Sequence, residues 1–240
     1  MSGNWTRRKM LQASGITALS SVSWSSARSP RATAQNPNMP KICLGAANNL
    51  DEKGMNALKQ IGVEYVLMGG PRIPWEEADI RARLDHFRAA GITVCNMMIS
   101  GFNDVIWGKP GADEQIELFI KSIRAAGKAG LPVIEYNFYG NRLIEGYKEE
   151  LGRGGAGYTA YDYEISRNLP PREDVGTHSR AEQMKRAERF LKAVVPEAEK
   201  AGTRLALHPN DPPVPLSRGS EQIMAGFEHW KQYLNLVKSP

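Results

Sequence analysis

The chain has 240 residues, of which 41% are hydrophobic and 24% are charged, and this composition is typical of a globular protein. Its formal net charge is +5. Residues 1–34 contain five basic and no acidic side chains, and removing these five from the 31 basic residues leaves 26, which equals the number of acidic residues. The rest of the chain therefore has no excess positive charge. This excludes a basic groove for phosphates, and we expect no nucleic-acid partner.

Residues 1–34 have the features of an export signal. Arg7 and Arg8 precede a modestly apolar stretch rich in Ala, Ser and Gly, and the sequence ATAQ offers a cleavage site after Ala34. A twin-arginine pair in this position is typical of a Tat signal, so we expect a periplasmic or exported protein. The alternative is a disordered basic tail. No apolar run in the sequence reaches the ~20 residues that cross a bilayer, so no membrane span is predicted.

After residue 40, apolar runs alternate with segments of helical periodicity. Strands are predicted at residues 41–47, 63–69, 92–99, 131–138 and 203–209. Helices are predicted at residues 51–62, 75–91, 112–130, 179–201 and 220–237. Asp51 and Ser220 are placed to cap the first and the last of these helices. A polar insert rich in Gly and Tyr occupies residues 139–178.

The predicted strands are near-continuous apolar runs, which indicates a parallel sheet buried on both faces and therefore the α/β class. Right-handed crossovers leave two architectures, an open doubly wound sheet and a (β/α)8 barrel. No Gly-x-Gly-x-x-Gly follows the first strand, which argues against a dinucleotide-binding sheet. Eight barrel units need about 250 residues. Residues 35–240 hold only about five of the eight units, so we expect a small open sheet or the N-terminal part of a parallel (β/α) barrel.

Polar side chains follow the predicted strands, where functional groups gather in parallel α/β folds. These strand-end residues are Asn48, Asn49, Arg72, Asn96, Ser100, Asn103, Glu135, Tyr136, Asn137, Tyr139, His208, Asn210, Asp211 and Arg218. Amides bind hydroxyl groups, and arginine binds a carboxylate through a bidentate fork. The strand ends therefore predict a site for a small polyhydroxylated acid.

The stretch LALHPNDPP places His208 at the end of an apolar strand. Pro209 favours an extended backbone at His208, so we expect the imidazole to lie at the rim of the sheet. A fixed neutral imidazole suits Mn, Fe or Zn, and a hydrogen-bonded histidine without a metal is the alternative. Glu135 is either a metal ligand or base at the end of its strand, or an outward partner for a basic side chain on a helix.

The chain has two cysteines, Cys43 and Cys95, and both lie in apolar, strand-like runs. The pattern favours two buried small side chains and does not match a zinc motif. An exported protein also permits a disulfide between them, and the sequence leaves this pairing open.

Residues 189–237, from RFLKAVVPEAEKAGTRLALHPNDPP to EHWKQYLNLV, closely resemble the mannonate dehydratases. In that family a helix leads into a strand that ends in His-Pro-x-Asp-Pro-Pro, and a loop with an arginine follows. The sequence YNF at residues 136–138 is similar to the fourth strand of the same family. The likeness is weak before residue 131.

The resemblance implies a xylose-isomerase-like TIM barrel that uses Mn2+ or Fe2+. The implied reaction dehydrates D-mannonate to 2-keto-3-deoxy-D-gluconate in hexuronate catabolism. His208 is implied as a metal ligand. The residues implied at the substrate site are Asn137, Asn210, Asp211 and Arg218. This chemistry agrees with the residues, because a metal stabilises the charge that develops on a sugar acid when its α-proton leaves.

The family takes a cysteine, a second histidine, an aspartate and a catalytic tyrosine from later strands. We therefore expect the catalytic residues beyond residue 240, and we expect the 240-residue chain to be truncated and inactive alone. Two alternatives remain open. One is a metal-dependent sugar isomerase or epimerase in which Glu135 and His208 both bind the metal. The other is a non-catalytic exported sugar-binding protein. A homo-oligomer is also left open.

Overall fold

The computed structural model describes residues 40–142 and 145–239. The export signal predicted for residues 1–34 lies outside this range and stays a prediction. The described residues contain a parallel five-stranded sheet with the strand order β1-β2-β3-β4-β7. Its strands are Cys43–Gly45 (β1), Tyr65–Gly69 (β2), Thr93–Met98 (β3), Val133–Tyr136 (β4) and Arg204–Leu207 (β7). All five predicted strands are therefore confirmed.

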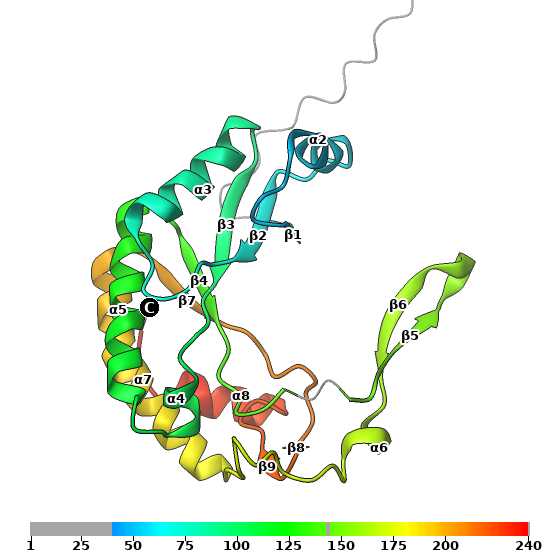
Figure 1. Ribbon diagram of the computed structural model, residues 1–240, viewed down its shortest axis with the longest axis vertical. Coiled ribbons are helices and arrows are strands. Elements are labelled where there is room, and N and C mark those ends of the chain that lie inside the picture. Colours follow the sequence, from blue (N-terminus) through cyan, green and yellow to red (C-terminus); the bar gives the residue numbers. More distant parts are fainter. Residues whose placement is uncertain (1–39, 143–144, 240) are drawn as a thin grey trace, which may run out of the picture. The chain divides into compact units, whose positions relative to one another are not determined.

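Helices connect these parallel strands. The long helices are Glu77–Ala89 (α3), Ala112–Ala129 (α5) and Arg180–Ala201 (α7), and they lie along one face of the sheet (Figure 1). The shorter helices are Glu52–Gln60 (α2), Asn103–Trp107 (α4), Tyr163–Ser166 (α6) and Phe227–Leu234 (α8). Among the described residues, no helix has the length and apolar character needed to cross a membrane.

Side-chain caps begin two of the predicted helices. Asp51 Oδ1 accepts a 2.8 Å hydrogen bond from the Gly54 amide at the start of α2, as predicted. At the start of α7, the Ser179 hydroxyl accepts from the Glu182 amide and the Glu182 carboxylate accepts from the Ser179 amide. Each cap satisfies backbone N–H groups that the first helical turn leaves unpaired.

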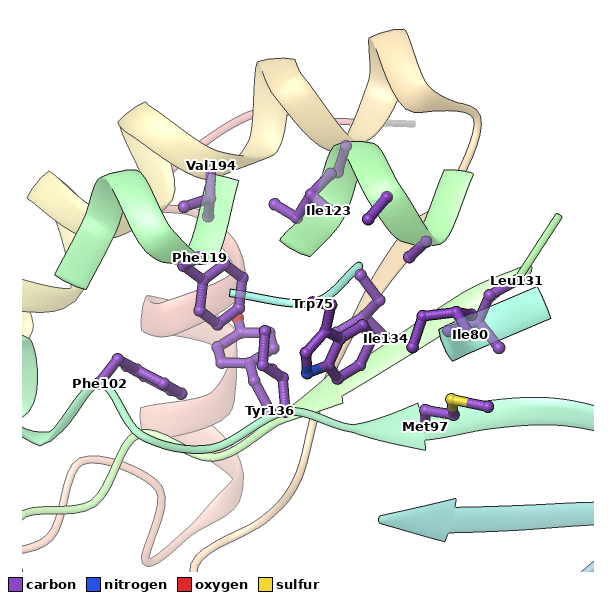
Figure 2. Packing of buried hydrophobic residues seen from close by; sticks show 14 of the residues in the cluster. Trp75, Ile80, Met97, Phe102, Phe119, Ile123, Leu131, Ile134, Tyr136 and Val194 are labelled. Atoms are coloured by element: carbon purple, nitrogen blue, oxygen red, sulfur yellow. The ribbon is translucent and has the colours of Figure 1, made fainter. Parts of the chain in front are cut away.

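The hydrophobic core lies between the sheet and the three long helices (Figure 2). Ile80, Leu84 and Phe87 of α3 are buried, as their helical spacing predicts. In α5 the predicted apolar face is buried as well, and Phe119 and Ile123 are fully enclosed. Burial of this face stabilises the helices, since each enclosed large apolar side chain contributes about 1.5–3 kcal/mol. One face of the sheet is therefore held by packing.

The polar insert forms structure of its own. Tyr147–Leu151 (β5) and Gly157–Tyr161 (β6) pair antiparallel in a two-stranded hairpin, and a short 3-10 turn at Arg153–Gly155 (η1) lies between them. The hairpin extends away from the five-stranded sheet (Figure 1). The helix α6 follows and leads back toward α7. The sequence marked this region only as polar.

The helix predicted at residues 220–237 is wrong in its first part. Leu216–Ser217 (β8) and Ser220–Glu221 (β9) form a small antiparallel pair, and α8 begins only after Gly226. Ser220 is therefore not a helix cap. Its hydroxyl instead accepts a hydrogen bond from the His178 amide at 3.1 Å, and this tertiary contact overrides the local helical pattern.

Candidate functional site

The two faces of β4 have different surroundings. Ile134, Tyr136 and Phe138 are buried in the core under the helices. Glu135 and Asn137 alternate with them and are only partly buried. The polar side chains therefore lie on the face of β4 opposite the hydrophobic core.

Three polar side chains from three adjacent strands form a row, which we call the Asn96–Glu135–His208 row. Asn96 belongs to β3, Glu135 to β4, and His208 follows the end of β7. Asn96 Nδ2 donates a 2.6 Å hydrogen bond to Glu135 Oε2. The other oxygen, Glu135 Oε1, lies 3.9 Å from His208 Nε2. The strand ends thus bring together three residues that are far apart in the sequence.

The tautomer of a neutral His208 follows from its hydrogen bond. His208 Nδ1 lies 2.7 Å from the carbonyl oxygen of Pro209, which can only accept, so Nδ1 carries the hydrogen. In the neutral ring, Nε2 then presents a lone pair towards Glu135. A lone pair and a carboxylate oxygen repel one another unless a cation or a proton lies between them. The side chains are only 28% and 16% exposed, so water screens this repulsion weakly.

These two side chains fit part of a metal site. Imidazole and carboxylate together suit Mn2+, Fe2+ or Zn2+. Two ligands of one ion lie roughly 3–3.5 Å apart, so the 3.9 Å separation needs only a small adjustment. Within residues 40–142 and 145–239, no group of three or more His, Cys, Asp or Glu side chains could hold a metal. The described residues therefore contain at most two side chains of such a site, and not a full ligand set.

Asn96 adds an unsatisfied acceptor beside this pair. Its Oδ1 is buried and has no hydrogen-bond partner within the described part of the chain. Turning the amide over would satisfy nothing, because Oδ1 would then face the Glu135 carboxylate. A buried acceptor without a partner is rare in proteins and calls for a donor such as water or a hydroxyl group. The row therefore contains one acceptor that the described residues leave without a donor.

Asp211 is held by side chains of the polar insert. Arg142 Nη2 donates a 2.9 Å hydrogen bond to Asp211 Oδ2, and the Tyr147 hydroxyl donates a short one to Asp211 Oδ1. Burial and the Asp211 carboxylate raise the pKa of Tyr147 to about 12, so the phenol stays protonated at neutral pH. Asp211 thus joins the insert to the loop after β7.

Arg218, between β8 and β9, also contacts the polar insert. Its guanidinium pairs with Glu145 of the insert and also donates to the carbonyl oxygen of Pro170 at 3.1 Å. Arg218 has a positive φ of 47°, in the left-handed region that non-glycine residues rarely adopt. The side chain predicted to bind a substrate carboxylate is therefore engaged by protein groups in this structure.

Asn210 and Asn137 differ in their surroundings. Asn210 is buried, its Nδ2 donates to Gln222 Oε1, and its Oδ1 accepts from the Met224 amide. Asn137 is only half-buried and lies next to the row, because Tyr136 is paired with Leu207 and His208 follows. Of the two asparagines, Asn137 is the more exposed.

Comparison with known proteins shows which proteins this chain resembles. The family model for D-mannonate dehydratase (UxuA) matches residues 163–240. A mannonate dehydratase from Streptococcus pneumoniae is 32% identical over 169 residues, which cover 57% of this chain and 43% of that protein. One from Thermotoga maritima is 29% identical over 229 residues, which cover 79% of this chain and 63% of that protein.

The crystal structure of the mannonate dehydratase from Streptococcus suis serotype 2 superposes with a TM-score of 0.75 at 26% identity. The match covers 84% of this chain and 62% of that one. This chain is a relative of the mannonate dehydratases. The resemblance found in the sequence and the parallel (β/α) barrel-type fold class are both confirmed. The chain spans about half the length of the first two curated relatives it matches, 43% and 48%.

Some site residues of this mannonate dehydratase relative were missed by the sequence. Arg142, Glu145 and Tyr147 all come from the polar insert, where no periodicity assigns a position to any side chain. Their only signal was a polar side chain in a segment that follows a strand end. By contrast, Asn96 and Glu135 were found because each is a polar residue within an apolar strand. None of the observed contacts tests the roles predicted for Asn137, His208, Asn210, Asp211 and Arg218, and these stay predictions.

A cavity of about 760 Å³ lies elsewhere, between α7, β7 and α8. Its walls are mainly apolar, with Leu191, Val195 and Leu205 among them. It lies on the helix side of the sheet, and Tyr136 is the strand-end residue among those that line it. The other polar strand-end side chains of the candidate site lie on the opposite face, at the Asn96–Glu135–His208 row.

Proposed function

We propose that this chain carries part of the active site of a metal-dependent sugar-acid lyase. The proposed substrate is D-mannonate, and the proposed product is 2-keto-3-deoxy-D-gluconate. The observation that supports this most directly is the placement of His208 Nε2 3.9 Å from Glu135 Oε1, with both side chains mostly buried. The family relationship supports the choice of substrate.

In the proposed site, His208 and Glu135 would hold Mn2+ or Fe2+. The metal would act as a Lewis acid on the carboxylate and the neighbouring hydroxyl group of the substrate. Asn96 positions Glu135 through their 2.6 Å hydrogen bond, so one carboxylate oxygen is fixed and the other stays directed towards His208. Asn137 would donate a hydrogen bond to a hydroxyl group of the substrate.

Arg142 is the residue we propose for the substrate carboxylate. Its side chain is 52% exposed, whereas the Arg218 side chain is 19% exposed and paired with Glu145. Asp211 and the Tyr147 hydroxyl engage part of its guanidinium, and a planar carboxylate would bind through N–H groups on its exposed side. Tyr139 lies within the electrostatic reach of Arg142, Asp211 and Glu135, and burial raises the pKa of its phenol. Tyr139 would therefore be a neutral hydrogen-bond donor between the two halves of the site.

Metal binding tests this proposal directly. The purified chain is titrated with Mn2+, and electron paramagnetic resonance measures the Mn2+ that stays free in solution. Glu135→Gln and His208→Asn are the test variants. Each is expected to weaken Mn2+ binding at least tenfold. Glu149→Gln, an exposed glutamate on β5, is the matched control and should bind as the wild type does. Unchanged affinity in both test variants would show that the row is not a metal site.

The choice of substrate is tested in the same titration: if D-mannonate binds at this site, it should increase the affinity of the chain for Mn2+. Arg142→Ala should remove this effect of D-mannonate, whereas Arg153→Ala at the tip of the hairpin should keep it. An equal effect from neutral D-mannose would exclude a carboxylate-specific site.

A sugar isomerase or epimerase is the second candidate, because a metal held by Glu135 and His208 would serve its chemistry equally well. The two candidates differ in their products. The lyase releases a 2-keto-3-deoxy acid from D-mannonate, whereas an isomerase or epimerase converts a neutral sugar without loss of water. The Mn2+ titration separates them on this chain: D-mannonate should tighten Mn2+ binding at a lyase site, whereas a neutral ketose should tighten it at the site of an isomerase or epimerase.

A further inference from the structure

The two cysteines lie in direct contact. Cys43 Sγ and Cys95 Sγ are 2.8 Å apart, although the sequence separates the residues by 52 positions. Cys43 belongs to β1 and Cys95 to β3, and β2 lies between these strands. Both thiols are free and partly exposed. Nothing in the proposed lyase chemistry uses either of them.

A bulge explains how thiols on non-adjacent strands meet. The register of β2 and β3 shifts between Val66 and Leu67, which pair with Val94 and Asn96. Cys95 is the extra residue of β3 and has no opposite residue on β2. A bulge changes the direction of the local side chain. Here the Cys95 thiol donates to the carbonyl oxygen of Val66 at 3.4 Å, over the strand that separates it from Cys43.

We propose that Cys43 and Cys95 form a peroxide-sensitive thiol pair, which closes to a disulfide that ties the edge strand β1 to β3. A disulfide has an S–S distance of about 2.05 Å and a Cα–Cα distance of about 4.4–6.8 Å, whereas strands two positions apart in a sheet lie roughly 9–10 Å apart, so closure brings the sulfur atoms together and also draws β1 towards β3. This displacement falls on β1, a strand of three residues whose neighbour Ile42 is 89% exposed. An edge strand with little burial can shift at low cost.

The chemistry assigns different roles to the two sulfur atoms. The Cys43 thiolate attacks one oxygen of hydrogen peroxide, the O–O bond breaks, and a sulfenic acid forms with release of hydroxide, which takes up a proton to give water. Cys95 then attacks the sulfenic sulfur, its proton joins the leaving hydroxide, and a second water is released. Two thiols and one peroxide give one disulfide and two waters. Cys43 lies on the edge strand β1, where peroxide reaches it first, and burial raises the pKa of Cys95 to about 12, which suits Cys95 to the second step.

The consequence is a covalent closure of the segment that contains α2, β2 and α3. Cross-linking residues this far apart restricts the unfolded chain, and the effect grows with the length of the closed loop. We expect the oxidised protein to melt about 5 to 10 °C above the reduced one. Reductant should return the melting temperature to its starting value.

The test treats the full chain with one equivalent of hydrogen peroxide and titrates its thiols in denaturant. The reduced chain should show two thiols and the treated chain none, with a mass lower by two hydrogen atoms and a cross-linked peptide joining residues 43 and 95. In Cys95→Ser, Cys43 should accumulate as a sulfenic acid that dimedone captures. The double variant Cys43→Ser/Cys95→Ser should show no thermal shift. Two titratable thiols after treatment, a disulfide between two chains, or dimedone capture at Cys95 alone would each overturn the proposal.

Discussion

Asn210 Nδ2 donates a 2.8 Å hydrogen bond to Gln222 Oε1, and both side chains are buried. The same asparagine accepts from the Met224 amide at 2.8 Å. Asn210 therefore holds the loop after β7 against the segment before α8. This relationship assigns the asparagine a structural role whether or not a ligand also reaches it.

Replacement of Asn210 should cost stability. Asn210→Ala removes the N–H donor to Gln222 Oε1 and the oxygen that accepts from the Met224 amide. Each lost hydrogen bond leaves a buried polar group unpaired, which costs about 1–3 kcal/mol. We expect the free energy of unfolding to fall by roughly 2–4 kcal/mol in urea denaturation. Asn48→Ala, on an exposed turn, should change it by less than about 0.5 kcal/mol. Equal effects in the two variants would contradict the structural role.

The capping box of α7 gives a second test. Ser179→Ala removes the hydroxyl that accepts from the Glu182 amide, and such a change costs about 1 kcal/mol. Chemical denaturation of Ser179→Ala and of Ser100→Ala, an exposed loop serine, measures the difference. Retention of full stability in Ser179→Ala would mean that water replaces the cap without cost.

The packing of the hydrophobic core is tested by replacing two isoleucines, one buried and one exposed. Ile123 is fully buried in α5, whereas Ile42 is 89% exposed. Ile123→Ala should lower the free energy of unfolding by about 2–5 kcal/mol, because it removes buried methyl groups and leaves a cavity. Ile42→Ala should change it by less than about 0.5 kcal/mol. Thermal melts of both variants test this, and a similar loss in each would contradict the packing in Figure 2.

His178 predicts a pH dependence of stability. Burial, and then the positive charge of Arg186, which donates to His178 Nδ1 at 3.1 Å, lower the pKa of His178 below its usual value of about 6.5. The unfolded chain therefore binds a proton more readily than the folded chain does. Stability from this group is complete above about pH 6.5 and is lost as the pH falls towards the lower folded value.

The measurement for His178 is urea denaturation between pH 8 and pH 5. The wild type should lose stability below about pH 6.5, and His178→Gln should lose less over the same interval because it has no titrating imidazole. His86→Gln, on the exposed surface of α3, should follow the wild type. A pH profile of His178→Gln that overlays the wild-type profile would contradict this assignment.

The sequence predicted the repeating part of the fold well, because hydrophobic periodicity reports burial. The strand from Val133 to Tyr136 and the apolar face of α5 follow directly from it. The same pattern identified Glu135 as a candidate site residue, because it is a carboxylate within an otherwise apolar strand. It failed at residues 220–226, where hydrogen bonds to distant groups such as the His178 amide hold an extended backbone.

The insert contributions to the site could not be predicted for a related reason. Arg142 and Tyr147 reach Asp211 only because the chain folds back from the hairpin to the loop after β7. No local sequence pattern predicts that the insert folds back onto this loop. Pairing between two polar segments depends on the tertiary position of both, and a single sequence carries no record of it.

The Asn96–Glu135–His208 row has a consequence for how the protein acquires activity during folding. Its three members come from three successive strands of the sheet, and α5, the polar insert and α7 separate them along the chain. Secondary structure can form locally while the row is still dispersed. Metal affinity should therefore be the last property gained on refolding and the first lost on mild denaturation, ahead of any loss of helical circular dichroism.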